Sequence, residues 1–167
     1  MRTLLRTVCA CAAALVLVAW TSAPVGPPWI SIEHPPSPYD ATTRGAFLLV
    51  HAFHHGTPAN FPVLGSAEGI VDGKRVSRRL EFSRTSRTGV YALAKQWSGE
   101  GVWTLVVSAK QGPTDSVTAV VELAPSGQVA SVVVPTERRD GYHIPKAVSM
   151  REVEADLRGR VARLATR

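Results

Sequence analysis

Apolar and polar residues alternate along short runs through most of the chain between positions 29 and 135. The runs recur at intervals of roughly ten residues and are separated by turn residues, a spacing typical of antiparallel sandwiches. No helical periodicity lies between them, which argues against a parallel sheet with crossover helices. We therefore predict an all-β domain over residues 29–135, an antiparallel β-sandwich of about seven or eight strands.

The clearest alternation lies at Thr88–Lys110, where two runs flank the glycine-containing segment Ser98–Gly101. This pattern predicts a β-hairpin with that segment as its turn. Asp72–Gly73 predicts a second tight turn between two strands. The other strands are expected at Trp29–Glu33, Ala46–His55, Pro62–Val71, Val76–Phe82, Val117–Leu123 and Val129–Pro135, the first of them at a sheet edge because prolines flank it.

The pattern changes after residue 135, where a polar segment precedes a helical periodicity. Apolar residues recur there at spacings of three and four and predict an amphipathic helix; they are Met150, Val153, Leu157, Val161 and Leu164. The helix is expected over Ser149–Ala165, with Ser149 as N-cap and Glu152 as its capping-box partner.

The apolar stripe of this helix has three alternative contacts. It can pack on the chain's own sandwich, dock on a protein partner, or lie on a membrane surface as a peripheral contact. In the second case, Val153, Leu157 and Val161 are the helix residues that we assign to partner binding.

The first 23 residues have the three parts of a secretory signal peptide. Arg2 and Arg6 precede the apolar run Val8–Trp20, and small residues follow it. The run has 13 residues, fewer than the roughly 20 that a membrane-spanning helix needs. We therefore predict an exported protein, periplasmic or extracellular, with a proline-rich linker at residues 24–28. Because Pro24 directly follows the expected cleavage site, an uncleaved N-terminal anchor is the alternative.

The two cysteines of the chain, Cys9 and Cys11, both lie inside this predicted signal. The mature domain is therefore expected to have neither disulfides nor thiolate ligands, and its core alone must hold it together.

Basic residues outnumber acidic ones by 19 to 13, a net charge of +6. Removal of the signal leaves 17 against 13, a net charge of +4. This charge is too dispersed to indicate nucleic acid as a partner. The densest basic run is either a solvated face that protects a sheet edge from pairing, or a contact for anionic lipid or cell-wall polymer; it contains Lys74, Arg75, Arg78, Arg79, Arg84 and Arg87.

Three histidines gather near the end of one expected strand: His51, His54 and His55. Imidazole is a common ligand of zinc and copper(II), so these residues are candidate metal ligands. His51 and His55 would lie about 13 Å apart along an extended strand. A shared site therefore requires the strand to end near His54, with His34 or a carboxylate completing the shell. The other interpretation is a polar strand end at the rim of the sandwich.

Four aromatic residues form either core or a ligand platform: Trp29, Tyr91, Trp97 and Trp103. Core packing is favoured for Trp103, which alternates in phase with the apolar residues of its strand. Tyr91 suits a corner tyrosine that bonds nearby backbone. Trp97, beside the expected hairpin turn, is the aromatic residue that we assign to partner binding.

Enzyme motifs are missing from the sequence. Gly65–Gly69 is no nucleophile elbow because its serine is in the second position. No HExxH motif occurs, and the residues around Gly73–Arg75 lack the glycine spacing of a phosphate loop. The carboxylates show no paired spacing, so we expect no enzymatic activity.

The glycine and aromatic positions resemble those of a known group of domains. Gly89-Val90-Tyr91 and Gly101-Val102-Trp103, with Gly65, Gly69 and Asp72-Gly73 upstream, are similar to the pattern of YtkA-like and FixH-like β-sandwiches of bacterial cell envelopes. The resemblance covers Trp29–Pro135, and carboxypeptidase-regulatory and transthyretin-like modules are more distant relatives. It implies an immunoglobulin-like or transthyretin-like fold and a non-catalytic module. Some members are linked to copper or oxidase assembly, but Met150 is the only methionine after the signal, whereas copper(I) carriers use methionine clusters.

Together these patterns predict an exported, non-catalytic module of the cell envelope that binds a protein partner or an envelope surface, without a cofactor. The alternative is a histidine-dependent copper(II)- or zinc-binding envelope protein.

Overall fold

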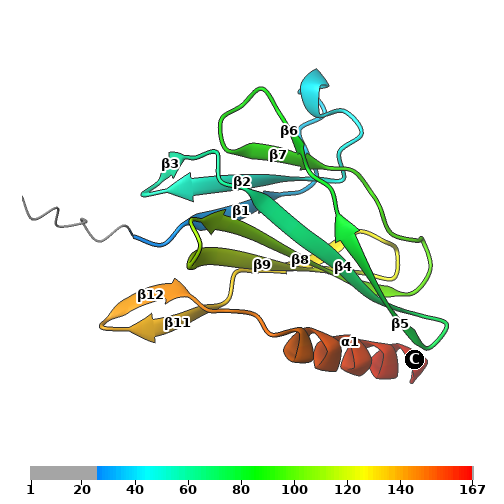
Figure 1. Ribbon diagram of the computed structural model, residues 1–167. Coiled ribbons are helices and arrows are strands. Elements are labelled where there is room, and N and C mark those ends of the chain that lie inside the picture. Colours follow the sequence, from blue (N-terminus) through cyan, green and yellow to red (C-terminus); the bar gives the residue numbers. More distant parts are fainter. Residues whose placement is uncertain (1–25, 167) are drawn as a thin grey trace, which may run out of the picture.

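The computed structural model describes residues 26–166. The predicted signal peptide and the first two residues of the predicted linker lie outside the described residues. Two antiparallel sheets form the body of the molecule, and a C-terminal helix lies against one of them (Figure 1). The prediction of an all-β antiparallel sandwich with a C-terminal helix is confirmed.

The first sheet has the strand order β1-β2-β7-β6, and β3 also pairs with β2. Its strands are β1 (Trp29–Glu33), β2 (Leu48–His54), β3 (Thr57–Pro58), β6 (Ser83–Arg84) and β7 (Val90–Leu93). A short 3-10 helix, η1 (Ala41–Thr43), lies between β1 and β2.

The second sheet has the order β10-β9-β8-β4-β5. Its strands are β4 (Val63–Val71), β5 (Lys74–Leu80), β8 (Val102–Gln111), β9 (Asp115–Leu123) and β10 (Val129–Val133). The two sheets thus hold ten strands, more than the seven or eight predicted, because β3 and β6 are only two residues long. An alternation pattern cannot reveal strands of that length.

The core lies between the sheets and is built from alternate residues of the long strands. On β8, Trp103, Leu105 and Val107 are buried, as the alternation predicts. The indole of Trp103 lies on the backbone of β4, where a Cβ on Gly69 would come within 2.5 Å of the ring. Gly69 is therefore required for this close approach, and β4 continues through it in regular register with both neighbouring strands.

The predicted hairpin at Thr88–Lys110 is wrong. Its two strands, β7 and β8, belong to different sheets, and β8 pairs with β4 and β9 instead. The intervening residues 94–101 cross from one sheet to the other. In a sandwich both sheets bury alternate residues, so alternation alone cannot distinguish a hairpin from a crossing.

Two other local predictions are confirmed. β4 and β5 form a hairpin through Asp72 and Gly73, which have the positive φ angles of +50° and +72° that a tight turn requires. The helix α1 (Met150–Ala165) begins with a complete capping box between Ser149 and Glu152.

The segment expected to be merely polar contains a hairpin of its own. β11 (Thr136–Arg139) and β12 (Tyr142–Pro145) form a separate two-stranded sheet that projects beside the sandwich (Figure 1). Asp140 and Gly141 make its turn, again with positive φ angles. The turn has the same Asp-Gly sequence as the turn between β4 and β5.

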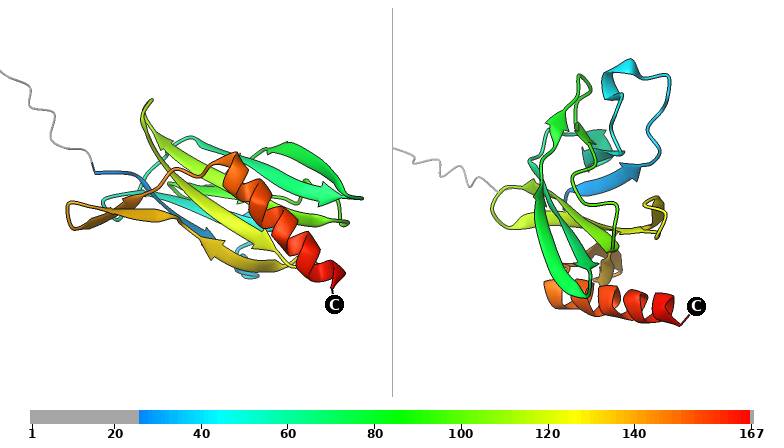
Figure 2. Two further views of the ribbon diagram at one scale, coloured as in Figure 1. Left: turned by 90° about the horizontal axis from the view of Figure 1, so that it is seen from below. Right: turned by 90° about the vertical axis from the view of Figure 1, so that its right-hand side faces the viewer.

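Helix α1 packs on its own sandwich, which is the first of the three alternatives for its apolar stripe. It contacts β4 and β8 and crosses the outer face of the second sheet obliquely (Figure 2). Val153 is 5% exposed and Leu157 is fully buried. Arg160 adds hydrogen bonds from its guanidinium to Thr104 Oγ1 at 2.7 Å and to the Leu123 carbonyl oxygen at 2.5 Å.

Candidate ligand cleft

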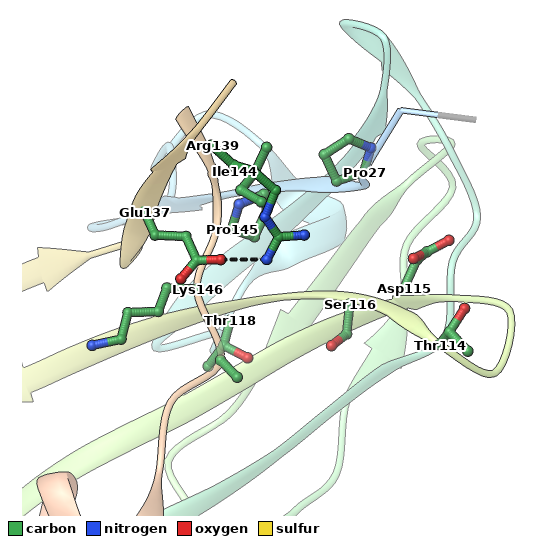
Figure 3. A pocket seen from close by; sticks show the side chains of 11 residues that line it. Pro27, Thr114, Asp115, Ser116, Thr118, Glu137, Arg139, Ile144, Pro145 and Lys146 are labelled. Carbon is green, nitrogen blue, oxygen red and sulfur yellow. Dashed lines mark hydrogen bonds and ion pairs between the residues drawn. The ribbon is translucent and has the colours of Figure 1, made fainter. Parts of the chain in front are cut away.

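A cleft opens between the outer face of β9 and the projecting β11–β12 hairpin (Figure 3). Its volume is about 670 Å³, within the range of roughly 300–1,000 Å³ that is typical of small-molecule sites. The lining residues come from the linker, from β9 and the turn before it, and from the hairpin and the residues that follow it; they are Pro27, Thr114, Asp115, Ser116, Thr118, Glu137, Arg139, Ile144, Pro145, Lys146 and Ala147.

The floor of the cleft carries hydroxyl groups because of the strand alternation of β9. Val117 and Ala119 are buried in the core, so Ser116 and Thr118 point to the opposite face, into the cleft. Thr118 Oγ1 lies 2.7 Å from Ser108 Oγ on the neighbouring strand β8. This hydrogen bond holds the floor in place and leaves hydroxyl groups available to a ligand.

The wall formed by the hairpin carries an ion pair. Arg139 Nη2 donates to Glu137 Oε1 at 2.7 Å, and both side chains lie on the cleft side of the hairpin (Figure 3). Tyr142 is the direct cross-strand neighbour of Arg139, so it lies on the same face of the hairpin. The Tyr142 side chain is 74% exposed, which places a free aromatic ring beside the cleft.

The charges that line the cleft balance. Asp115 at the start of β9 and Glu137 on the hairpin provide two negative charges, while Arg139 and Lys146 provide two positive ones. Lys146 Nζ also lies 3.6 Å from Glu152 Oε1 at the start of α1. The described lining includes neither histidine nor cysteine. The cleft therefore offers hydroxyl, carboxylate, guanidinium and ammonium groups for hydrogen bonding.

The three candidate histidine ligands do not come together. His51 lies on the outer face of β2, where its Nε2 is 2.8 Å from Glu33 Oε2. His54 lies on the opposite face, with its ring against Phe61. His54 and His55 are neighbours, with ring centroids 4.3 Å apart. Among residues 26–166, no group of three or more His, Cys, Asp or Glu side chains is placed to hold a metal ion.

Three of the four residues assigned to partner binding are buried in the folded domain. Trp97 is 6% exposed and packs edge-on against Phe47, with ring centroids 5.0 Å apart. It lies in the crossing between the sheets and not beside a hairpin turn, which explains why it is core. Val153 and Leu157 are covered by the sandwich, and Val161 is half-buried. None of the four side chains is fully exposed to solvent for a partner to contact.

Sequence reasoning missed the cleft, although part of its signal is visible in the chain. Asp140-Gly141 lies between two short strands and is the same tight-turn dipeptide as Asp72-Gly73. The runs on either side are four residues each and mostly polar, so their strand character was not apparent. The position of the hairpin against β9 depends on tertiary packing.

The protein is a β-sandwich whose C-terminal helix covers part of the outer face of the second sheet. Comparison with known proteins finds no matching family model, no matching curated protein and no matching solved structure. Within the described part of the chain, no helix has both the length and the apolar character needed to cross a membrane.

Proposed function

We propose that this protein is an exported, non-catalytic binding module that holds a cell-wall polymer in the cleft between β9 and the β11–β12 hairpin. The observation that supports this proposal is the cleft, which combines a volume of about 670 Å³ with hydrogen-bonding groups from three separate parts of the chain. The predicted signal peptide supports a location outside the cytoplasm. With Val153 and Leu157 buried against the sandwich, the cleft replaces the helix stripe as the binding surface.

The chemistry of the lining supports binding. Ser116 and Thr118 have hydroxyl groups with no adjacent histidine in the lining, and a serine or threonine nucleophile usually needs such a base. The carboxylate of Glu137 is bound to Arg139. Groups of this kind orient a ligand through hydrogen bonds.

A sedimentation experiment with purified peptidoglycan sacculi tests the proposal. The protein from residue 24 onward is incubated with sacculi, and the bound fraction is measured after centrifugation. Arg139→Ala and Thr118→Trp are each expected to lower the association constant, obtained from the bound fraction over a range of sacculus concentrations, at least about fivefold, which corresponds to about 1 kcal/mol. Arg138→Ala is the matched control, because Arg138 lies on the opposite face of the same hairpin.

Failure of the wild-type protein to sediment with sacculi would overturn the proposal. Equal retention by the wild type and the two cleft variants would show that the cleft is not the binding surface. Circular dichroism of each variant confirms that a loss of binding is not a loss of folding.

We propose a metal site as a second candidate function, on one specific observation. Gln111 Nε2 lies 3.4 Å from His54 Nε2, and Gln111 Oε1 is buried without a hydrogen-bond partner among the described residues. A buried acceptor without a donor is costly, and a cation held by His54 and His55 would satisfy it. Imidazole nitrogen suits copper(II) and zinc.

Titration with zinc and copper(II), followed by calorimetry, tests this candidate. His54→Ala is expected to remove saturable metal uptake. His51→Ala is expected to leave uptake unchanged, because His51 is bonded to Glu33 on the other face of β2. The metal proposal fails if the wild-type protein shows no saturable uptake or if His54→Ala binds metal as the wild type does.

A further inference from the structure

We infer that the ligand of the cleft is a neutral saccharide, a chain of uncharged sugar units; this inference rests on the proposed function. Two features of the cleft support it: the balance of its charges and the kinds of side chain that face it.

The backbone at the floor of the cleft is paired on one side only, which makes an extended peptide the competing ligand. β9 pairs with β8 along nearly its whole length, but β10 pairs only with residues 120–123, so among the described residues the edge of β9 at positions 115–119 has no second partner strand. β11 and β12 pair with each other, and the hairpin turns a face toward the cleft. Extended peptides usually bind by adding a strand to an open edge. Hexaalanine is therefore included as a probe for this competing ligand.

The balanced charge of the lining favours a neutral ligand. Two acidic residues, Asp115 and Glu137, face two basic ones, Arg139 and Lys146. A polyanion or a polycation would meet as many repulsive as attractive charges in this cleft. A ligand of many hydroxyl groups meets donors and acceptors of both kinds without that repulsion.

The planar groups match the geometry of neighbouring sugar hydroxyls. Arg139 uses Nη2 to bind Glu137, and its side chain remains 66% exposed. A guanidinium has five N–H donors in a fixed plane, so further donors remain for a ligand. Carboxylates at Asp115 and Glu137 accept hydrogen bonds, while Ser116 and Thr118 both donate and accept.

The exposed ring of Tyr142 completes the set of contacts. A sugar ring has an apolar face of C–H groups, which packs on an aromatic face while the hydroxyl groups bond elsewhere. Tyr142 stands beside Arg139 on the cleft side of the hairpin and is 74% exposed. The ring thus extends the cleft with an apolar surface next to its polar groups.

Three neutral hexasaccharides, chitohexaose, cellohexaose and maltohexaose, test the inference on the protein from residue 24 onward. Binding is followed by amide chemical shifts in ¹H–¹⁵N spectra, with hexagalacturonate as the acidic probe and hexaalanine as the peptide probe. At least one neutral hexasaccharide is expected to shift residues of β9 and of the hairpin. Its dissociation constant is expected to change less than about twofold as salt is raised, because no ligand charge is screened.

Tyr142→Ala and Arg139→Ala are each expected to raise that dissociation constant at least about tenfold, equivalent to about 1.4 kcal/mol. Tyr142→Phe is expected to retain binding, since the stacking face remains. The matched controls are Tyr39→Ala, at a tyrosine that is 95% exposed elsewhere, and Arg138→Ala; neither should change the constant.

Tighter binding of hexagalacturonate or of hexaalanine than of every neutral hexasaccharide would overturn the inference, and so would the absence of cleft shifts with all three neutral probes. If sacculi still bind in an Arg139-dependent manner, the proposed binding function survives and only the ligand class is wrong. If sacculi do not bind, the proposed function itself fails.

Discussion

Glu68 is a buried carboxylate on the outer face of the second sheet, 2% exposed, and it connects the sheet to the helix. It accepts hydrogen bonds from Arg75 Nη2 at 2.7 Å and from Ser77 Oγ at 2.8 Å. The same guanidinium also binds Glu154 of α1. Burial by itself would raise the pKa of Glu68, but hydrogen bonds from Ser66, Arg75 and Ser77 outweigh it and hold the pKa below its ordinary value.

The lowered pKa predicts a pH-dependent stability that Glu68→Gln removes. Because the folded-state pKa lies below the unfolded-state value of about 4.3, the stabilisation is present above pH 4.3 and is lost as the pH falls through the folded-state pKa. At pH 7 we expect Glu68→Gln to lower the free energy of unfolding by about 2 kcal/mol, the magnitude of hydrogen bonds to a charged group.

Urea denaturation of wild type and variant at pH 7 and pH 3 measures this effect. The difference in the free energy of unfolding should shrink at pH 3, because the carboxyl is then largely protonated in the unfolded state and the stabilisation declines as the pH falls towards the folded-state pKa. Glu122→Gln, at a half-buried carboxylate of the same sheet, serves as control and should change stability by no more than about 0.5 kcal/mol. A difference for Glu68→Gln that stays constant between the two pH values would contradict the argument.

At the scale of the element, α1 is part of the folded domain. Leu157 is fully buried against the sandwich, whereas Leu164 on the same stripe is 39% exposed. We expect Leu157→Ala to lower the free energy of unfolding by about 2–4 kcal/mol through lost burial and a residual cavity. Leu164→Ala, the matched control, should cost less than about 1 kcal/mol. The measurement is urea denaturation, and equal effects of the two substitutions would show that the helix does not dock through Leu157.

The elements also show which parts of the structure the sequence can specify. The limits of α1 and its capping box follow from local chemistry at Ser149 and Glu152, so they were predicted correctly. The same is true of the β4–β5 turn. The strands that pair with β7 and β8 were not predicted correctly, because an alternating strand has the same pattern whichever sheet it joins.

The candidate site was the least predictable part for a related reason. From the sequence, the floor residues Ser116 and Thr118 are predicted to lie on the solvent-exposed face of an ordinary strand. Its wall, the β11–β12 hairpin, is polar and has little burial of its own. The cleft forms only because the hairpin packs beside β9, so that the outer face of β9 and one face of the hairpin enclose a space.

At the scale of the whole molecule, the crossing between β7 and β8 joins the two sheets through Trp97. Because this indole is 6% exposed and packs against Phe47, which precedes β2, we expect Trp97→Ala to lower the free energy of unfolding by about 3–5 kcal/mol. Trp29→Ala, at a tryptophan that is 39% exposed, should cost less than about 1 kcal/mol. Urea unfolding is followed by far-ultraviolet circular dichroism and by tryptophan fluorescence. The two probes should coincide in the wild type, because sheets that share one core unfold together. Separate transitions in the wild type, or equal costs for the two tryptophan substitutions, would show that Trp97 does not couple the sheets.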